Sequence, residues 1–256
     1  MRHPPVLVPH REIHMSKHPS VTSVVFQQLV NDYGAKDFEY CLGEYIAKAQ
    51  APEQAFTSAS LHAATQHVLT FVPFYKVAVY HHIKFTEYDP YSITKGPEFV
   101  VDTIQAEPNR KDKYGRPIPG RFDTALIKVN GGEANGVKVG QIRCIFTLPK
   151  AGLQEWFPET SIQPAKYLAY VEWFTPFKQG PELNHLMYKV THAFHPGEHV
   201  RLASVIPVET ICRSVHLYPR FGLHAPLEWK SSNVLQLCDT FFVNDFLDRA
   251  TYATVY

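Results

Sequence analysis

The sequence predicts an α+β fold that is mainly β, built around an antiparallel β-barrel. Three observations predict it. Apolar residues recur at every second position through the middle of the chain, turns rich in glycine and asparagine separate these segments, and helical spacing is confined to the two ends. With 256 residues, of which 45% are hydrophobic and 19% charged, the chain can bury a core without disulfides or metals.

The chain begins with helical spacing. A short helix is expected from Phe26 to Tyr33, because its apolar residues fall three and four positions apart and Gly34 follows where a left-handed residue would end a helix. Asp37 can cap a second helix, which Pro52 stops. Each helix has one apolar face and must pack on something larger. We therefore predict a helical N-terminal arm over residues 1–68.

The period changes to two in the next part of the chain. Alternation from Tyr75 to Phe85 is longer than most strands, so a bend or bulge is expected within it. Further strands are expected at Glu98–Gln105, Arg121–Val129, Lys138–Leu148, Tyr167–Phe174, Leu186–Phe194, Arg201–Ile206 and Ser214–Tyr218. Turns are expected at Asn130–Gly136 and at Pro196 and Gly197. Short connections predict an antiparallel meander, and its second face, which is not uniformly polar, favours closure into a barrel over residues 69–222.

Helical spacing returns in residues 223–256. Ser231 or Ser232 can cap a helix that carries Leu237 and Phe241. Its apolar surface, which Phe246 and Leu247 extend, should dock on the barrel as a C-terminal helical segment.

The balance of charge and the spacing of the cysteines restrict the partners and the cellular compartment that we expect for the protein. The 25 Lys and Arg residues nearly balance the 24 Asp and Glu residues, so any contact with nucleic acid must come from a local patch. The four cysteines form no CxxC pair, which predicts reduced, mostly buried thiols in an intracellular protein, nuclear or cytoplasmic. No apolar run is long enough for a signal peptide or a membrane span, so no membrane partner is expected. The cysteines are Cys41, Cys144, Cys212 and Cys238.

A basic loop is expected over residues 106–121, where prolines and glycines punctuate a polar run. Its basic residues are Arg110, Lys111, Lys113, Arg116 and Arg121, and Asp112 is the acidic residue counted against them. Such a loop can follow a phosphate backbone, with Tyr114 as a stacking ring, and would bind nucleic acid without sequence preference. The alternative, a solvated loop between strands, is the commoner role of such a run.

An aromatic strip is the second candidate site. Tyr170, Trp173, Phe174 and Phe177 could form a cage or groove for a peptide carrying methylated lysine. Ordinary packing in the core is the favoured alternative, because Trp173 shares the alternation that faces the core.

Catalytic and metal chemistry is weakly indicated. His192, His195 and His199 invite a metal site, but a strand that enters a turn would separate them. Glu172 and His216 could in principle serve a hydrolase, although a structural ion pair of Glu172 with Arg143 or Arg213, or its plain exposure, is favoured. The chain has no nucleophile elbow and no glycine-rich phosphate loop. We predict no catalytic residue, no metal and no cofactor.

Several sequence segments, taken in their order along the chain, resemble those of a known protein family. They are LVPHREIHMSKHPSV (7–21), YGAKDFEYCLGEYIA (33–47), VAVYHHIKF (77–85), VGQIRCIF (139–146), YLAYVEWFTPF (167–177), MYKV (187–190), SVIPVETICRSVHLYPRFG (204–222) and CDTFFVNDFLDR (238–249). This series resembles the C-terminal region of transposases from fungal DNA transposons of the Plavaka group, related to the CACTA superfamily, over nearly the whole chain.

The resemblance implies a chain without the catalytic core. In that family, strand transfer is implied to belong to an RNase H-like core with three metal-binding carboxylates, which lies N-terminal to the matching region and has no counterpart here. Met1 begins in the middle of the resembling region, so either a gene fragment or a decayed element is expected. The order of VGQIRCIF, YVEWF and VIPVETI also resembles bromo-adjacent homology modules, which are small barrels of the SH3-like kind found in chromatin proteins.

Two functions follow as expectations. The first is a non-catalytic accessory region of a transposon-encoded protein that contacts DNA, chromatin or the transposase core. The alternative is a chromatin-reader-like module whose aromatic rim, Tyr170, Trp173 and Phe177, holds a peptide. A decayed fragment without molecular function is the remaining alternative.

Overall fold

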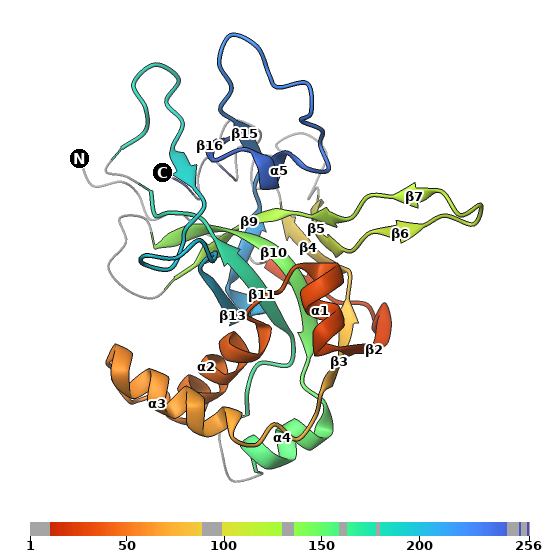
Figure 1. The fold of residues 1–256 in the computed structure, drawn as a ribbon, viewed down its shortest axis with the longest axis vertical. Helices are drawn as coiled ribbons and strands as arrows, with labels where there is room; N and C mark the ends of the chain where they lie inside the picture. Colours follow the sequence, from red (N-terminus) through yellow and green to blue (C-terminus); the bar gives the residue numbers. More distant parts are fainter. Residues whose placement is uncertain are drawn as a thin grey trace.

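A computed structural model describes most of the chain. The described residues are 11–88, 99–129, 136–158, 163–177, 180–244, 251 and 255. Strands in several sheets form the middle of the molecule, and most of the helices lie together on one side of it (Figure 1). Every pairing between the strands is antiparallel, which confirms the α+β, mainly β class.

The described strands divide over four sheets. The largest is seven-stranded and contains β2 (Val21–Val25), β3 (Lys76–Tyr80), β9 (Thr124–Lys128), β10 (Val137–Thr147), β11 (Leu168–Trp173), β13 (Ala203–Pro207) and β14 (Ile211–Ser214). The four-stranded sheet contains β1 (Arg11–His14), β4 (His82–Tyr88), β5 (Phe99–Glu107) and β8 (Arg121–Phe122). The three-stranded sheet contains β12 (Lys189–Thr191), β15 (Leu217–Pro219) and β16 (Thr240–Val243), and β6 (Arg110–Lys111) pairs with β7 (Pro117–Ile118).

The expected long strand bends at His81. Val79, before the bend, packs into the core under the helices, whereas Ile83, after it, packs into a second core between the two largest sheets. Both residues have odd numbers, so a straight strand would point them to one face. The bend therefore confirms the expected irregularity, and it carries the chain from one sheet into the next.

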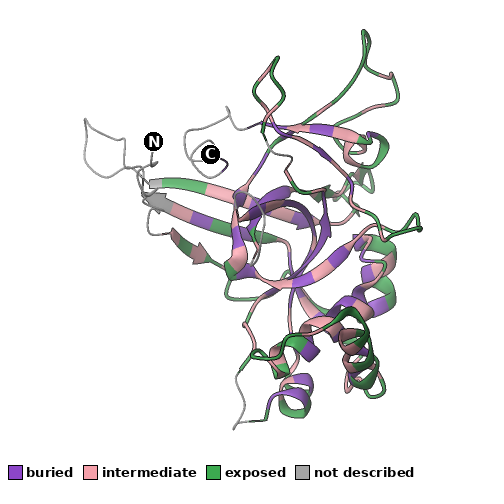
Figure 2. Ribbon diagram, turned by 90° about the vertical axis from the view of Figure 1, so that its left-hand side faces the viewer, coloured by how far each residue is buried: buried purple, intermediate pink, exposed green. Residues whose placement is uncertain are grey.

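The predicted closed barrel is not found among the described residues. The strands remain in separate sheets: the chain leaves the largest sheet at His81, between β3 and β4, and returns to it at Asp123, between β8 and β9. The second face of the largest sheet, whose mixed polarity suggested closure, is covered instead by helices: Phe38 of α2 lies 5.0 Å from Phe146 of β10, ring centre to ring centre. Burial is accordingly concentrated in the central strands (Figure 2).

The two predicted N-terminal helices are found as α1 (Phe26–Tyr33) and α2 (Phe38–Gln50). Two further helices were not predicted individually: α3 (Ser58–Leu69) in the same region, and α4 (Lys150–Trp156) between β10 and β11. Gly34 ends α1 with a φ of +73°, as its position predicts. The same region also supplies two strands, β1 and β2, that pair with β4 and β3. The sequence of β2, VTSVV, is rich in the β-branched residues that favour strands.

The C-terminal segment differs from the expected helix. The helix α5 (Val234–Leu237) is four residues long, and Phe241 lies on β16, where its side chain is fully buried. The expected turn from Asn130 lies almost wholly outside the described residues, as do Phe246 and Leu247. The four cysteines are all unpaired, and all but Cys212 are buried. Within the described part of the chain, no helix is both long and apolar enough to cross a membrane.

Candidate nucleic-acid interface

The basic segment forms a β-hairpin that projects from the body of the protein (Figure 1). The basic hairpin, residues 107–120, leaves the four-stranded sheet where β5 pairs with β8, and its arms pair again at β6 and β7. In that pairing Arg110 lies opposite Ile118, and Lys111 lies opposite Pro117. The expected flexible loop is therefore an ordered two-stranded ribbon.

Asp112 organises the turn at the tip of the basic hairpin. Its carboxylate accepts hydrogen bonds from the backbone N–H groups of Tyr114, at 2.8 Å, and Arg116, at 2.9 Å. Gly115 completes the turn with a φ of +79°. These hydrogen bonds, first among them the one from the Arg116 backbone, hold the pKa of the Asp112 carboxyl below its ordinary value. The carboxylate is therefore charged at neutral pH, and the turn is locked by its own side chain.

Hydrogen bonds also fix the base of the basic hairpin. The backbone N–H of Gly120 donates a hydrogen bond of 2.6 Å to the side-chain oxygen of Asn109, which joins the two arms. The backbone N–H of Gln105 donates to the Asp123 carboxylate at 2.8 Å and fixes β5 against the start of β9. The ribbon therefore leaves the body in a defined direction.

Three of the five basic side chains form ion pairs with nearby carboxylates. Their N–O distances are 2.8 Å for Arg110 with Glu107, 2.7 Å for Arg116 with Asp112, and 2.8 Å for Arg121 with Asp123. The charge count covered residues 109–121 and so left out two of these partners, Glu107 and Asp123, which flank that span. The available positive charge is consequently smaller than the sequence suggested.

Lys111 and Lys113 form no ion pair with any described residue, and both side chains are exposed. Lys111 ends β6, and Lys113 lies in the turn that follows it. Tyr114 at the tip is 69% exposed, and its ring contacts two cations, Lys113 Nζ at 4.9 Å and Arg116 Cζ at 5.2 Å from the ring centre. The hairpin thus concentrates cationic groups at and beside its tip.

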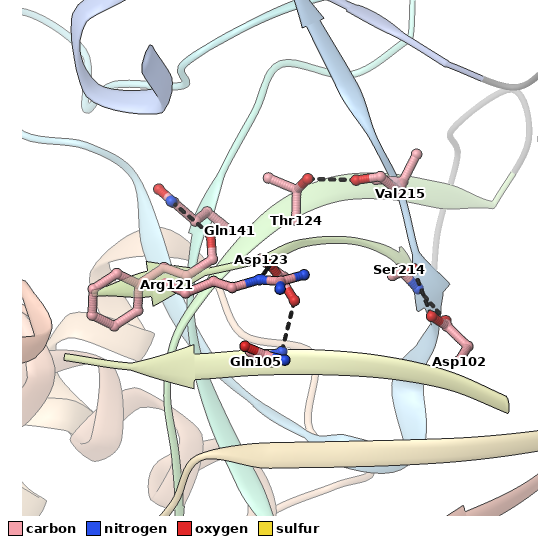
Figure 3. Close-up of polar contacts among 9 residues, drawn as sticks. Asp102, Gln105, Arg121, Asp123, Thr124, Gln141, Ser214 and Val215 are labelled. Carbon is pink, nitrogen blue, oxygen red and sulfur yellow. Dashed lines mark hydrogen bonds and ion pairs between the residues drawn. The ribbon is translucent and has the colours of Figure 1, made fainter. Parts of the chain in front are cut away.

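A polar network lies where the basic hairpin joins the body (Figure 3). The Asp102 carboxylate of β5 accepts hydrogen bonds from the backbone and hydroxyl of Ser214, at 2.6 and 2.7 Å, and so ties β5 to β14. Gln141 donates to the carbonyl oxygen of Phe122 at 3.1 Å, and Thr124 donates to that of Val215 at 2.6 Å. None of these residues was predicted from the sequence, although polar side chains that interrupt apolar strands were a usable signal.

The aromatic strip is not gathered into one site. Tyr170 and Trp173 are buried in different cores, and their polar atoms bond internally, to the Asp37 N–H at 3.3 Å and to the Ser204 hydroxyl at 3.0 Å. Phe177 belongs to a third core, where its ring packs 4.9 Å from that of Tyr188. These rings are occupied by packing, as the favoured alternative predicted.

The candidate catalytic groups make contacts of their own with other residues. Glu172 is buried and pairs with Arg201 at 2.9 Å, and an Nη atom of Arg201 lies 3.3 Å from Nε2 of His192. The ion pair is structural, as favoured, and the partner at this distance is Arg201, while the Glu172 carboxylate also interacts electrostatically with Arg143. His216 is exposed and packs on Tyr218 instead. Among the described residues, no group of three or more His, Cys, Asp or Glu side chains is placed to hold a metal.

Comparison with known protein families shows the family to which the chain belongs. The model of the family described as "Domain of unknown function (DUF6830)" matches residues 4–191, which is most of the chain. The chain belongs to the DUF6830 family. No curated protein and no solved structure matches it.

The DUF6830 match includes the basic hairpin but ends before the fold does. Strands β13 and β14 follow residue 191, yet they pair with β11 and β9 inside the matched span. The C-terminal strands therefore complete the largest sheet of this DUF6830 chain. The basic hairpin itself lies wholly within the family region.

Proposed function

We propose that this DUF6830 chain is a non-catalytic accessory region of a transposon-encoded protein and that it binds nucleic acid through the basic hairpin. One observation carries the proposal: an ordered ribbon projects from the body and presents Lys111 and Lys113 at and beside its tip, exposed and with no ion pair to any described residue. Lysines in this position can neutralise phosphates and release the counterions bound to them.

The arginines of the basic hairpin add charge that can be redirected. Their ion pairs are solvent-exposed, with Arg110 55% and Arg116 73% exposed, and pairs of this kind contribute only about 0–1 kcal/mol. A phosphate can therefore replace the carboxylate partner at small cost. Since the whole chain carries a net charge of +1, binding should be weak and strongly dependent on salt.

The test is the salt dependence of binding to a labelled DNA duplex, followed by fluorescence anisotropy from about 50 to about 200 mM NaCl. We expect the logarithm of the association constant to fall with the logarithm of the salt concentration, with a slope of about −2 to −4. The double variant Lys111→Ala, Lys113→Ala should reduce the magnitude of this slope by about 2, because each phosphate that a lysine neutralises contributes roughly 0.9 to it.

A matched control removes the same charge elsewhere. Lys150 begins α4, on the helical side of the molecule away from the basic hairpin. Lys230 lies in the segment before α5, and both side chains are exposed. The variant Lys150→Ala, Lys230→Ala should keep the wild-type slope. Equal slopes for the wild type and the hairpin variant would eliminate the hairpin as the contact, and undetectable binding would reject the proposal.

A further inference from the structure

We infer that the basic hairpin enters the major groove of B-form duplex DNA, so that the substrate class is double-stranded DNA rather than RNA or single strands. This inference rests on the proposed function and goes beyond it, because phosphate contacts alone do not distinguish these nucleic acids. Three features of the hairpin lead to it: its shape, the chemistry of its tip and its rigidity.

The shape fits the groove. The major groove of B-form DNA, about 12 Å wide and about 8.5 Å deep, admits a two-stranded β-ribbon. The arm runs from Glu107, at the end of β5, through β6 to Asp112 at the start of the turn, and at about 3.3 Å per residue it reaches at most roughly 16 Å. The tip can therefore reach the base edges before the body of the protein meets the phosphates on either side.

The tip is built for hydrogen bonding rather than for stacking. The Tyr114 ring contacts Lys113 and Arg116, so it holds two cationic donors at the end of the ribbon. Arginine and lysine are the side chains that most often donate to the O6 and N7 atoms of guanine in the major groove. Proteins that bind single strands instead offer successive aromatic rings to the bases, and the basic hairpin has Tyr114 as its one ring.

The hairpin is ordered before any ligand binds. Asp112 closes the turn through two backbone N–H groups, and Asn109 joins the arms at the base. A ribbon fixed in this way loses little conformational entropy on insertion. The major groove of A-form RNA is deep and too narrow for such an element, so a rigid ribbon should discriminate against duplex RNA.

The experiment compares four probes of equal length and sequence with the full chain at one low salt concentration. They are a DNA duplex, an RNA duplex, a DNA single strand, and a DNA duplex whose cytosines carry glucosylated hydroxymethyl groups. The last probe keeps the phosphate charge but fills the major groove. We expect the plain DNA duplex to bind at least about ten-fold more tightly than each of the other three.

The outcomes separate the inference from the proposed function. Binding to no probe would overturn both. Equal binding to the plain and glucosylated DNA duplexes, with the slope still reduced in the Lys111→Ala, Lys113→Ala variant, would keep the proposed function and overturn groove insertion. Tighter binding to the RNA duplex or to the single strand would also overturn the inference.

A turn variant provides a second measurement. Asp112→Ala removes the side chain that accepts from Tyr114 and Arg116, while it raises the net positive charge of the hairpin. Preference for the plain over the glucosylated duplex should fall towards one-fold, although overall affinity should not decrease. An unchanged preference in this variant, with the rest of the fold intact by circular dichroism, would contradict insertion of a rigid ribbon.

Discussion

His192 should make the protein less stable in mild acid. Its side chain is buried, its ring stacks on Phe174 with 4.8 Å between ring centres, and a guanidinium nitrogen of Arg201 lies 3.3 Å from its Nε2 atom. Burial, followed by the positive charge of Arg201, lowers the pKa of His192 from 6.5 to about 4. The folded protein therefore holds this imidazole neutral at a pH where an unfolded chain would protonate it.

The sign and size of the effect follow from that difference. Because the folded-state pKa is the lower one, protonation favours the unfolded chain as the pH falls below 6.5, and the loss of stability is complete below about 4. No effect of His192 is expected above pH 6.5. At about 1.4 kcal/mol for each pH unit between the two pKa values, the full loss is on the order of 3 kcal/mol.

The assay is urea unfolding of the wild type and of His192→Gln at about pH 7.5 and about pH 4.5. The variant should be less stable at the higher pH, because it loses the stacked ring. The difference between the two proteins should shrink by about 2 kcal/mol at the lower pH, since only the wild type carries this proton linkage. Glu172, Arg201 and Asp239 are present in both proteins, so their own titration largely cancels. A difference that stays constant with pH would refute the proposed linkage.

Two further predictions concern packing and helix capping. Gly140→Ala should lower the free energy of unfolding by about 1–3 kcal/mol in urea titrations, because its new Cβ would lie 2.3 Å from Cγ1 of Val171. A variant as stable as the wild type would show that the side chains around Gly140 can move to make room for the methyl group. Thr57→Ala should cost about 1 kcal/mol by the same measurement, since Thr57 and Ser60 form a capping box at the start of α3, and Thr57→Ser should restore most of it. Equal losses in both Thr57 variants would contradict the capping explanation.

Local pattern predicted the parts of the fold that depend on neighbouring residues. Helix α1 and its end at Gly34 were predicted because the spacing of apolar residues and the need for a left-handed residue are properties of a short segment. The antiparallel strands and the turn at Gly197, whose φ is +77°, were predicted for the same reason. The basic residues of the candidate site were also visible in the sequence, because charge needs no tertiary information to be counted.

The sequence by itself therefore determined the mainly β class, the antiparallel pairing and the position of the basic segment, but not the strand order, which is not the expected meander. Only the tertiary structure decided that the chain passes from one sheet to another at His81 and again at Asp123, and that no barrel closes among the described residues. It also decided that the basic segment is a ribbon and that Arg121 pairs with Asp123. The physical reason is that periodicity shows which residues share a face of a strand, whereas the surface that covers that face comes from distant parts of the chain.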